Sequence, residues 1–116
     1  MTESFDAMGL VGEGVDPKQM RRIILTHSYR AHVGHIGSCL CVVEILSALY
    51  GSVLRAQGPD DPNRDRFVLS KGHAGLALYA ALYLKKWISQ TQLDTFFTDN
   101  TLLAVHPEAA LQGVDF

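Results

Sequence analysis

The run from Ala74 to Leu84 limits how this chain can fold more than any other feature, because its eleven residues include no charged side chain. A second run, "CLCVVEILSALY" from 39 to 50, has only Glu44 and Ser47 as strongly polar residues. A helix on the surface of a small monomer shows a polar face, and these runs barely have one. We therefore expect helices over 39–50 and from 74 to about 87, buried on most sides against a sheet or another subunit.

Local signals place the remaining elements around these helices. Asp16 followed by Pro17 is typical of a helix start, with an acidic N-cap and proline in the first turn, and this helix should end near Arg30. Ser89 and Gln92 match a capping box for a short helix to about Phe97. The other segments are a Gly-rich N-terminal arm (1–15), a glycine-containing turn (31–38), a loop (57–65) and a short strand (66–70).

Composition and element pattern together indicate part of a globular domain. Hydrophobic residues make up 47% of the 116 residues and charged residues 19%, which is enough apolar material for a core. One strand cannot form a sheet, so we predict that residues 16–116 are an incomplete domain preceded by the arm 1–15. The predicted fold class is α/β, mainly helical in this segment.

Charge and cysteine content exclude several classes of protein. The formal net charge is −2, so nucleic acid and anionic membrane are not expected partners. Cys39 and Cys41 are too close together for a comfortable disulfide and indicate free thiols in a reducing compartment. The acidic first fifteen residues exclude an ordinary signal peptide, and the apolar runs are shorter than the roughly 18 residues that span a bilayer. We predict a soluble, cytoplasmic protein.

Three of the five histidines lie at loop positions beside glycine or proline, where functional side chains are commonly held. These are His35, His73 and His106, whereas His27 falls inside a helix, where an imidazole more often packs or meets solvent. A loop histidine taken alone is more often a surface or capping residue. Binding of zinc by these histidines is an alternative, but the chain has no HxH, HExxH or C-x-x-C spacing to favour a zinc site.

Three motifs, taken in order, resemble the N-terminal part of transketolase, and most closely the split enzymes whose halves are separate chains. They are "GHIGSCLCVVEILSALY", "DRFVLSKGHAGLALYAAL" and "HPEAALQGVDF", and the resemblance covers roughly residues 17–116. It implies a thiamine diphosphate cofactor with Mg²⁺, and transfer of a two-carbon ketol unit from a ketose phosphate to an acceptor. The acceptor stays open between a sugar phosphate and a lipoyl or carrier-protein group.

The resemblance also assigns roles to the three loop histidines. It implies that His35 and His73 lie near the cofactor's reactive carbon, with His73 also near the diphosphate, and that His106 contacts the donor's terminal hydroxyl. Addition to the ketose carbonyl would create an oxyanion, and the carbon–carbon cleavage that follows would remove a proton from the neighbouring hydroxyl. Imidazoles can donate to the first oxygen and accept from the second near neutral pH. The polar "SKGH" would then stand at the mouth of a core because a charged cofactor binds there.

Departures from the family pattern qualify these expectations. Val105 replaces the family's glycine before His106, Val33 stands where its "SGH" has serine, and Cys39 and Cys41 replace small residues, which could narrow the substrate entrance. The family pattern continues with "STGSLGQG" and a GDG…N metal motif, so we expect no metal ligands in this segment. The resemblance implies a C-terminal transketolase-like partner chain in an α2β2 assembly. The alternative is a diverged, non-catalytic remnant that binds or scaffolds a partner.

Overall fold

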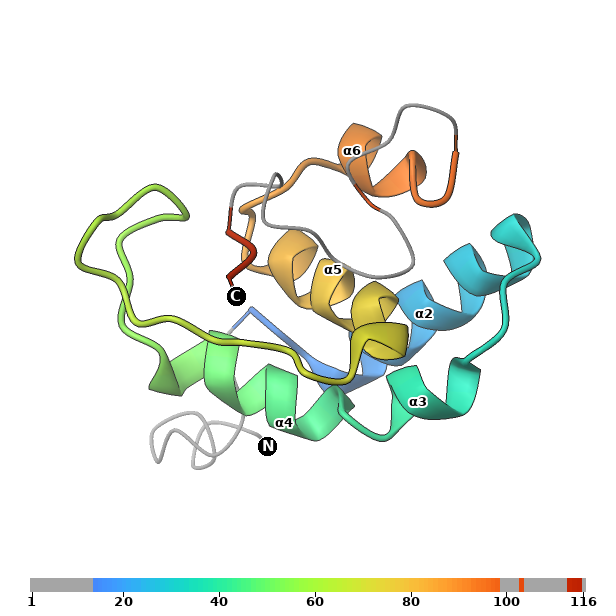
Figure 1. Cartoon of the computed structure of the whole chain (residues 1–116), viewed down its shortest axis with the longest axis horizontal. Coiled ribbons are helices and arrows are strands. Elements are labelled where there is room, and N and C mark those ends of the chain that lie inside the picture. The colour runs from blue at the N-terminus through green and yellow to red at the C-terminus, as the bar shows by residue number, and fades with distance from the viewer. Residues whose placement is uncertain (1–13, 99–102, 104–112, 116) are drawn as a thin grey trace.

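A computed structural model of the chain describes residues 14–98, 103 and 113–115 (Figure 1). The expected arm lies almost wholly outside these residues, as does His106. The described elements are the α-helices α2 (Pro17–Ala31), α3 (Ile36–Leu40), α4 (Val43–Ala48), α5 (Gly75–Leu84) and α6 (Gln90–Asp94), the π-helix η1 (Leu49–Val53) and the 3₁₀-helix η2 (Gly72–Ala74).

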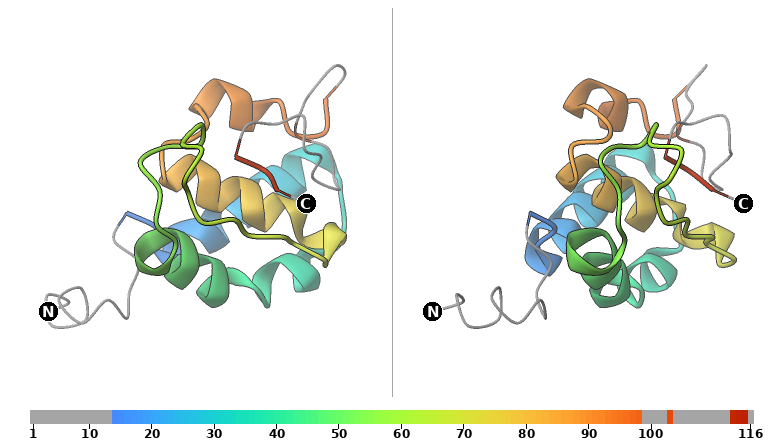
Figure 2. Two further views of the ribbon diagram at one scale, coloured as in Figure 1. Left: turned by 60° about the vertical axis from the view of Figure 1, so that its left-hand side comes forward. Right: turned by 90° about the vertical axis from the view of Figure 1, so that its left-hand side faces the viewer.

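Helix α5 is the centre of the core. Every residue from Gly75 to Leu82 is buried, and Tyr79 is fully buried. Helix α2 packs against it, and α6 lies on the opposite side of α5 from α3 and α4 (Figure 2). The helix is surrounded because it has no polar face to leave in water, so the expected burial of this apolar run is confirmed.

The apolar run 39–50 is not the single buried helix that its composition predicts. The structure divides it at Cys41 and Val42, between α3 and α4, and then continues α4 into η1. Cys41 and Glu44 are exposed, and Ile45 is 58% exposed. The inner face, with Val43 and Leu46 fully buried, still packs against α2 and α5. The run is therefore buried along its inner face and exposed at one turn, so its expected burial holds in part.

Helix starts follow the local signals. The Asp16 carboxylate accepts a hydrogen bond from the Lys18 N–H, and proline follows at the first position of α2. At α6, the Ser89 hydroxyl accepts from the Gln92 N–H while the Gln92 side chain accepts from the Ser89 N–H. Both predicted caps are confirmed because each needs only residues within one helical turn.

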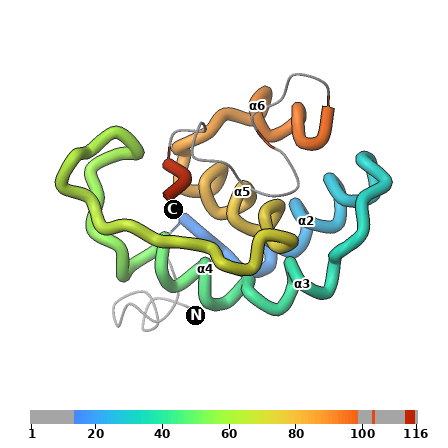
Figure 3. Tube along the Cα trace, in the orientation of Figure 1, coloured from blue at the N-terminus to red at the C-terminus, as the bar shows by residue number. Residues whose placement is uncertain are grey.

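The predicted strand over 66–70 does not form in the part of the chain that the structure describes. Backbone pairing there is limited to one isolated parallel bridge between Val68 and Asp115. The segment instead runs extended from the loop back to η2, beside α3 (Figure 3). A strand needs a neighbouring strand along its length, and a single bridge does not supply one. The α/β class stays a prediction, since the described part is helical.

A buried ion pair fastens this segment to the core. Arg64, 7% exposed, donates two hydrogen bonds to the Asp115 carboxylate, at 2.6 and 2.9 Å, and the Phe67 N–H donates to the same carboxylate at 3.0 Å. Burial opposes ionisation of Asp115, but the bonds from Arg64 and Phe67 outweigh it and hold the pKa of Asp115 below its ordinary value. The Arg64 guanidinium also lies 5.6 Å from the centre of the Trp87 ring.

Candidate functional site

A short connection with unusual backbone geometry positions His35. His32 caps the C-terminus of α2, with φ 54°, and His35 directly precedes α3, with φ 66°, so both histidines adopt the left-handed conformation. This conformation is uncommon outside glycine, although histidine is enriched there, and strained backbone clusters at functional sites. The turn leaves the His35 side chain exposed directly before α3.

His73 lies in η2, directly before the central helix α5. The Ala74 N–H donates to the Lys71 carbonyl at 2.9 Å and so closes this turn. His73 is exposed, while the next residue, Ala74, is fully buried. The imidazole therefore stands at the protein surface on a backbone anchored in the core.

These two imidazoles are brought into contact by the packing of α3 against η2. The ring centroids of His35 and His73 are 4.2 Å apart and the planes are inclined by 48°. The thiol of Cys39, buried in α3, lies 3.7 Å from the His73 carbonyl oxygen and donates to it. The motifs that carry the two histidines thus meet on one exposed face.

The pair can handle both protons and negative charge. Histidine is a common proton donor and acceptor in catalysis, and the amino-terminal turn of α5 favours an anion beside His73. Gly34 and Gly72 directly precede the two histidines in the chain and Gly37 follows His35 by two residues, and glycine allows close approach of a ligand to the backbone. For Gly34 and Gly37, an added Cβ would meet no atom within 4 Å.

Comparison with known proteins gives the family. Residues 17–116 match the model of the family described as "Transketolase, thiamine diphosphate binding domain". The chain belongs to this family. The 6-deoxy-6-sulfo-D-fructose transketolase subunit SqwG of Clostridium sp. (strain MSTE9) is 43% identical over 89 residues, which are 75% of this chain and 32% of that subunit.

Two further relatives support the same assignment to the transketolase family. One of the subunits of the apulose-4-phosphate transketolase of Phocaeicola vulgatus is 37% identical over 97 residues, covering 82% of this chain and 34% of the relative. The transketolase of Treponema pallidum is 38% identical over 93 residues, covering 77% of this chain and 14% of that enzyme. The chain thus spans about a third of the length of the first two relatives and less of the T. pallidum enzyme.

The other histidines of this transketolase domain have different surroundings. His27 is only 6% exposed: its Nδ1 lies 3.0 Å from the Ile23 carbonyl oxygen and its Nε2 lies 3.4 Å from Asp94 Oδ1. It is therefore a buried link between α2 and α6. His32 is exposed at the end of α2, with its ring 6.3 Å from that of Tyr29. His106 lies outside the described residues, so its role stays a prediction.

Two residues beside the pair were not predicted to belong to the site, although Cys41 was noted from the sequence as a free thiol. Lys71 precedes Gly72 and His73, and its Nζ lies 2.7 Å from the sulfur of Cys41 at the end of α3. Both cysteines are free thiols, as predicted, with Cys39 buried and Cys41 exposed. The available signal was the lysine within "SKGH" and the cysteine where the transketolase family has a small residue.

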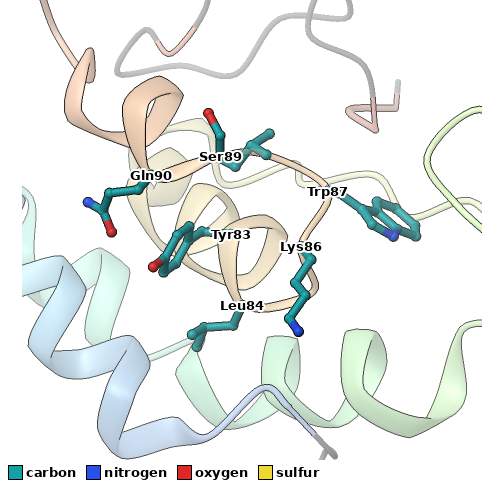
Figure 4. Close-up of a pocket in the computed structure, with 7 residues that line it drawn as sticks. Tyr83, Leu84, Lys86, Trp87, Ser89 and Gln90 are labelled. Carbon is teal, nitrogen blue, oxygen red and sulfur yellow. The ribbon is translucent and has the colours of Figure 1, made fainter.

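Possible metal ligands and a cavity are the remaining features of the transketolase domain, and the cavity lies away from the pair of His35 and His73. The described residues contain no group of three or more His, Cys, Asp or Glu side chains that could hold a metal ion. An open cavity of about 500 Å³ lies at the far end of α5 from His73, lined by Tyr83, Leu84, Lys86, Trp87, Ile88, Ser89 and Gln90 (Figure 4). None of the described helices is long and apolar enough to cross a membrane.

Proposed function

We propose that this chain is the N-terminal, thiamine diphosphate-binding part of a two-chain transketolase-like enzyme. The enzyme transfers a two-carbon ketol unit from a ketose phosphate to an acceptor. The observation that carries the proposal is the contact between His35 and His73 at 4.2 Å, on an exposed face of a thiamine diphosphate-binding domain. Relatives named as transketolase subunits support a two-chain arrangement.

The donor set suits the cofactor. Two imidazoles, three neighbouring glycines and the start of α5 offer neutral donors and close backbone approach to a diphosphate. We assign His73 to the diphosphate side of the cofactor and both His35 and His73 to its reactive carbon. When bound, thiamine diphosphate supplies the carbanion chemistry. Mg²⁺ would be held by residues outside the described ones, since these offer no cluster of metal ligands.

The histidines would then divide the proton transfers. One imidazole donates a hydrogen bond to the oxygen of the donor's carbonyl carbon, where negative charge develops. Its neighbour accepts the proton of the adjacent hydroxyl as the carbon–carbon bond breaks, and returns it to the product. His106 is proposed to hold the donor's terminal hydroxyl. The pair is exposed, so exclusion of water falls to a second chain that covers this face.

That second chain is proposed to be a C-terminal transketolase-like subunit, in an assembly of two copies of each. Co-expression followed by native mass spectrometry tests this arrangement, with a complex of two plus two chains expected. A well-folded monomer that does not bind such a partner would contradict it. The acceptor is proposed to be a sugar phosphate, with a lipoyl or carrier-protein group as the alternative.

The test of function compares matched histidine variants of the intact protein with its partner. His73→Ala and His35→Asn each remove an imidazole, and asparagine tolerates the left-handed backbone at position 35. Turnover of xylulose phosphate with saturating cofactor and Mg²⁺ should fall about a hundred- to thousand-fold in each, as for loss of one donor to a developing oxyanion.

His32→Asn is the control, because His32 is exposed and shares the left-handed backbone but lies outside the pair. It should keep wild-type turnover. Equal activity in all three variants would refute the assignment, as would consumption of pyruvate in place of a ketose phosphate. Partner binding without any turnover would favour the scaffolding alternative.

A further inference from the structure

Lys71 and Cys41 approach each other more closely than a hydrogen bond to sulfur requires. The Lys71 Nζ lies 2.7 Å from Cys41 Sγ, while Cys41 Sγ is also 3.4 Å from the Ser38 carbonyl oxygen. Hydrogen bonds from N–H to oxygen span about 2.7–3.2 Å, and sulfur is a larger atom than oxygen. A separation at the short end of that range is the distance that one bridging atom, bonded to both nitrogen and sulfur, would span.

Exposure makes Cys41 the thiol that oxidants reach. Cys41 and Lys71 are both exposed, whereas Cys39 is 3% exposed and donates its S–H to the His73 carbonyl. Burial raises the pKa of the Cys39 thiol above its ordinary value. Oxidation requires the thiolate and follows its accessibility, so an oxidant at this face meets Cys41 and leaves Cys39 reduced.

We propose that hydrogen peroxide joins Lys71 to Cys41 through a single oxygen atom, as Nζ–O–Sγ. One peroxide oxidises the Cys41 thiolate to the sulfenic acid, with water as the other product. A second peroxide oxidises the Lys71 amine to the hydroxylamine, again releasing water. The hydroxylamine oxygen then attacks the sulfenic sulfur and the sulfenic hydroxyl leaves as water. Nitrogen and sulfur lose two electrons each, and the two peroxides accept all four.

The position of this cross-link gives it a consequence for the histidine pair. Cys41 ends α3, which follows His35, and Lys71 precedes Gly72 and His73. The bridge therefore ties the two backbone segments that carry the imidazoles, and a thiol reductant releases it. Formation of the bridge does not depend on the proposed ketol transfer, so either proposal can fail without the other.

The test treats the intact protein with hydrogen peroxide and analyses its peptides by mass spectrometry. The expected product links the peptides containing residues 41 and 71, with a gain of one oxygen atom and a loss of two hydrogen atoms. A thiol reductant should separate them. Cys41→Ser and Lys71→Arg should abolish the linked peptide, while Cys39→Ala should retain it.

Thermal unfolding of the oxidised protein gives a second measurement. Joining positions 41 and 71 closes a loop in the unfolded chain, so the midpoint should rise by about 4 °C or more, and should not rise in Lys71→Arg. Four results would overturn the proposal: a direct nitrogen–sulfur link without oxygen, a disulfide between Cys39 and Cys41, sulfenic or sulfinic acid without a linked peptide, or a reduced Cys41 under excess peroxide.

Discussion

Replacement of Asp115 by asparagine should destabilise the protein strongly, although the two side chains have nearly the same shape. The Arg64 side chain is only 4% exposed, and its guanidinium contacts the Asp115 carboxylate at 2.6 and 2.9 Å. The substitution removes this carboxylate and leaves the buried guanidinium without its counter-charge. It also weakens the acceptor of the Phe67 N–H. Breaking a buried ion pair on one side costs about 3–5 kcal/mol, because the remaining charge stays buried.

The lower part of that range is expected for Asp115→Asn. Asparagine keeps one carbonyl oxygen that can accept from Arg64 or from Phe67, so part of the hydrogen bonding survives. A loss of about 3 kcal/mol is a large share of the roughly 5–15 kcal/mol that stabilises an ordinary domain. At about 4 °C per kcal/mol, the midpoint of thermal unfolding should fall by roughly 12 °C.

Urea unfolding followed by circular dichroism measures this loss, with Asp65→Asn as the matched control. Asp65 also contacts an arginine through two nitrogens, at 3.2 and 3.3 Å, but the Arg55 side chain is 88% exposed. Exposed pairs contribute less than about 1 kcal/mol, so the control should lose little stability. If the two variants lose the same free energy of unfolding, burial of the Arg64–Asp115 pair does not matter and the reasoning fails.

Three further predictions concern the pH dependence of the Asp115 contribution, the cap of α6 and the packing around α5. The pKa of Asp115 is held below its ordinary value in the folded protein. The contribution of Asp115 to stability is therefore complete above about pH 4 and is lost as the pH falls through the lower folded pKa. Urea midpoints measured below pH 4 should fall less steeply with pH in Asp115→Asn than in the wild type. Ser89→Ala removes the acceptor of the Gln92 N–H and should cost about 1 kcal/mol in urea unfolding, and an unchanged midpoint would contradict the capping role. Ala80→Leu adds volume where the side chain is fully buried; it should cost about 1–3 kcal/mol, and a variant as stable as the wild type would show spare room around α5.

Helix caps and the central helix could be predicted from the sequence because their causes are local. Asp16 with Pro17 and Ser89 with Gln92 act within one turn, and the charge-free run from Ala74 allowed only a buried helix. The interruption at Cys41 and Val42 gave no such signal, since neither glycine nor proline marks it. On one side of the break, α3 packs against η2, which lies about thirty residues away in the chain, so residues within the run do not reveal this contact.

Contacts between distant residues account for what the sequence did not predict. His27 contacts Asp94, which lies 67 residues away in the chain, and so joins α2 to α6, and no local pattern in the sequence indicated this contact. The pair of Arg64 and Asp115 spans 51 residues and left no local pattern either. The two residues His35 and His73 were assigned to one site only through the resemblance to transketolase, because neither periodicity nor spacing in the chain brings those rings together.

The uniform apolar character of α5 has a consequence for the direction in which His73 points. An amphipathic helix is held at a fixed rotation about its axis because turning it would expose apolar groups and bury polar ones. Helix α5 has no such constraint, so its rotation is set by how its own side chains, small at Ala77 and Ala81 and large at Leu78 and Tyr79, fit against the neighbouring elements. A core substitution that preserves hydrophobicity but alters shape could turn the helix and re-aim the imidazole while the protein stays folded. The geometry of the site therefore depends on core residues of α5 that do not contact a ligand.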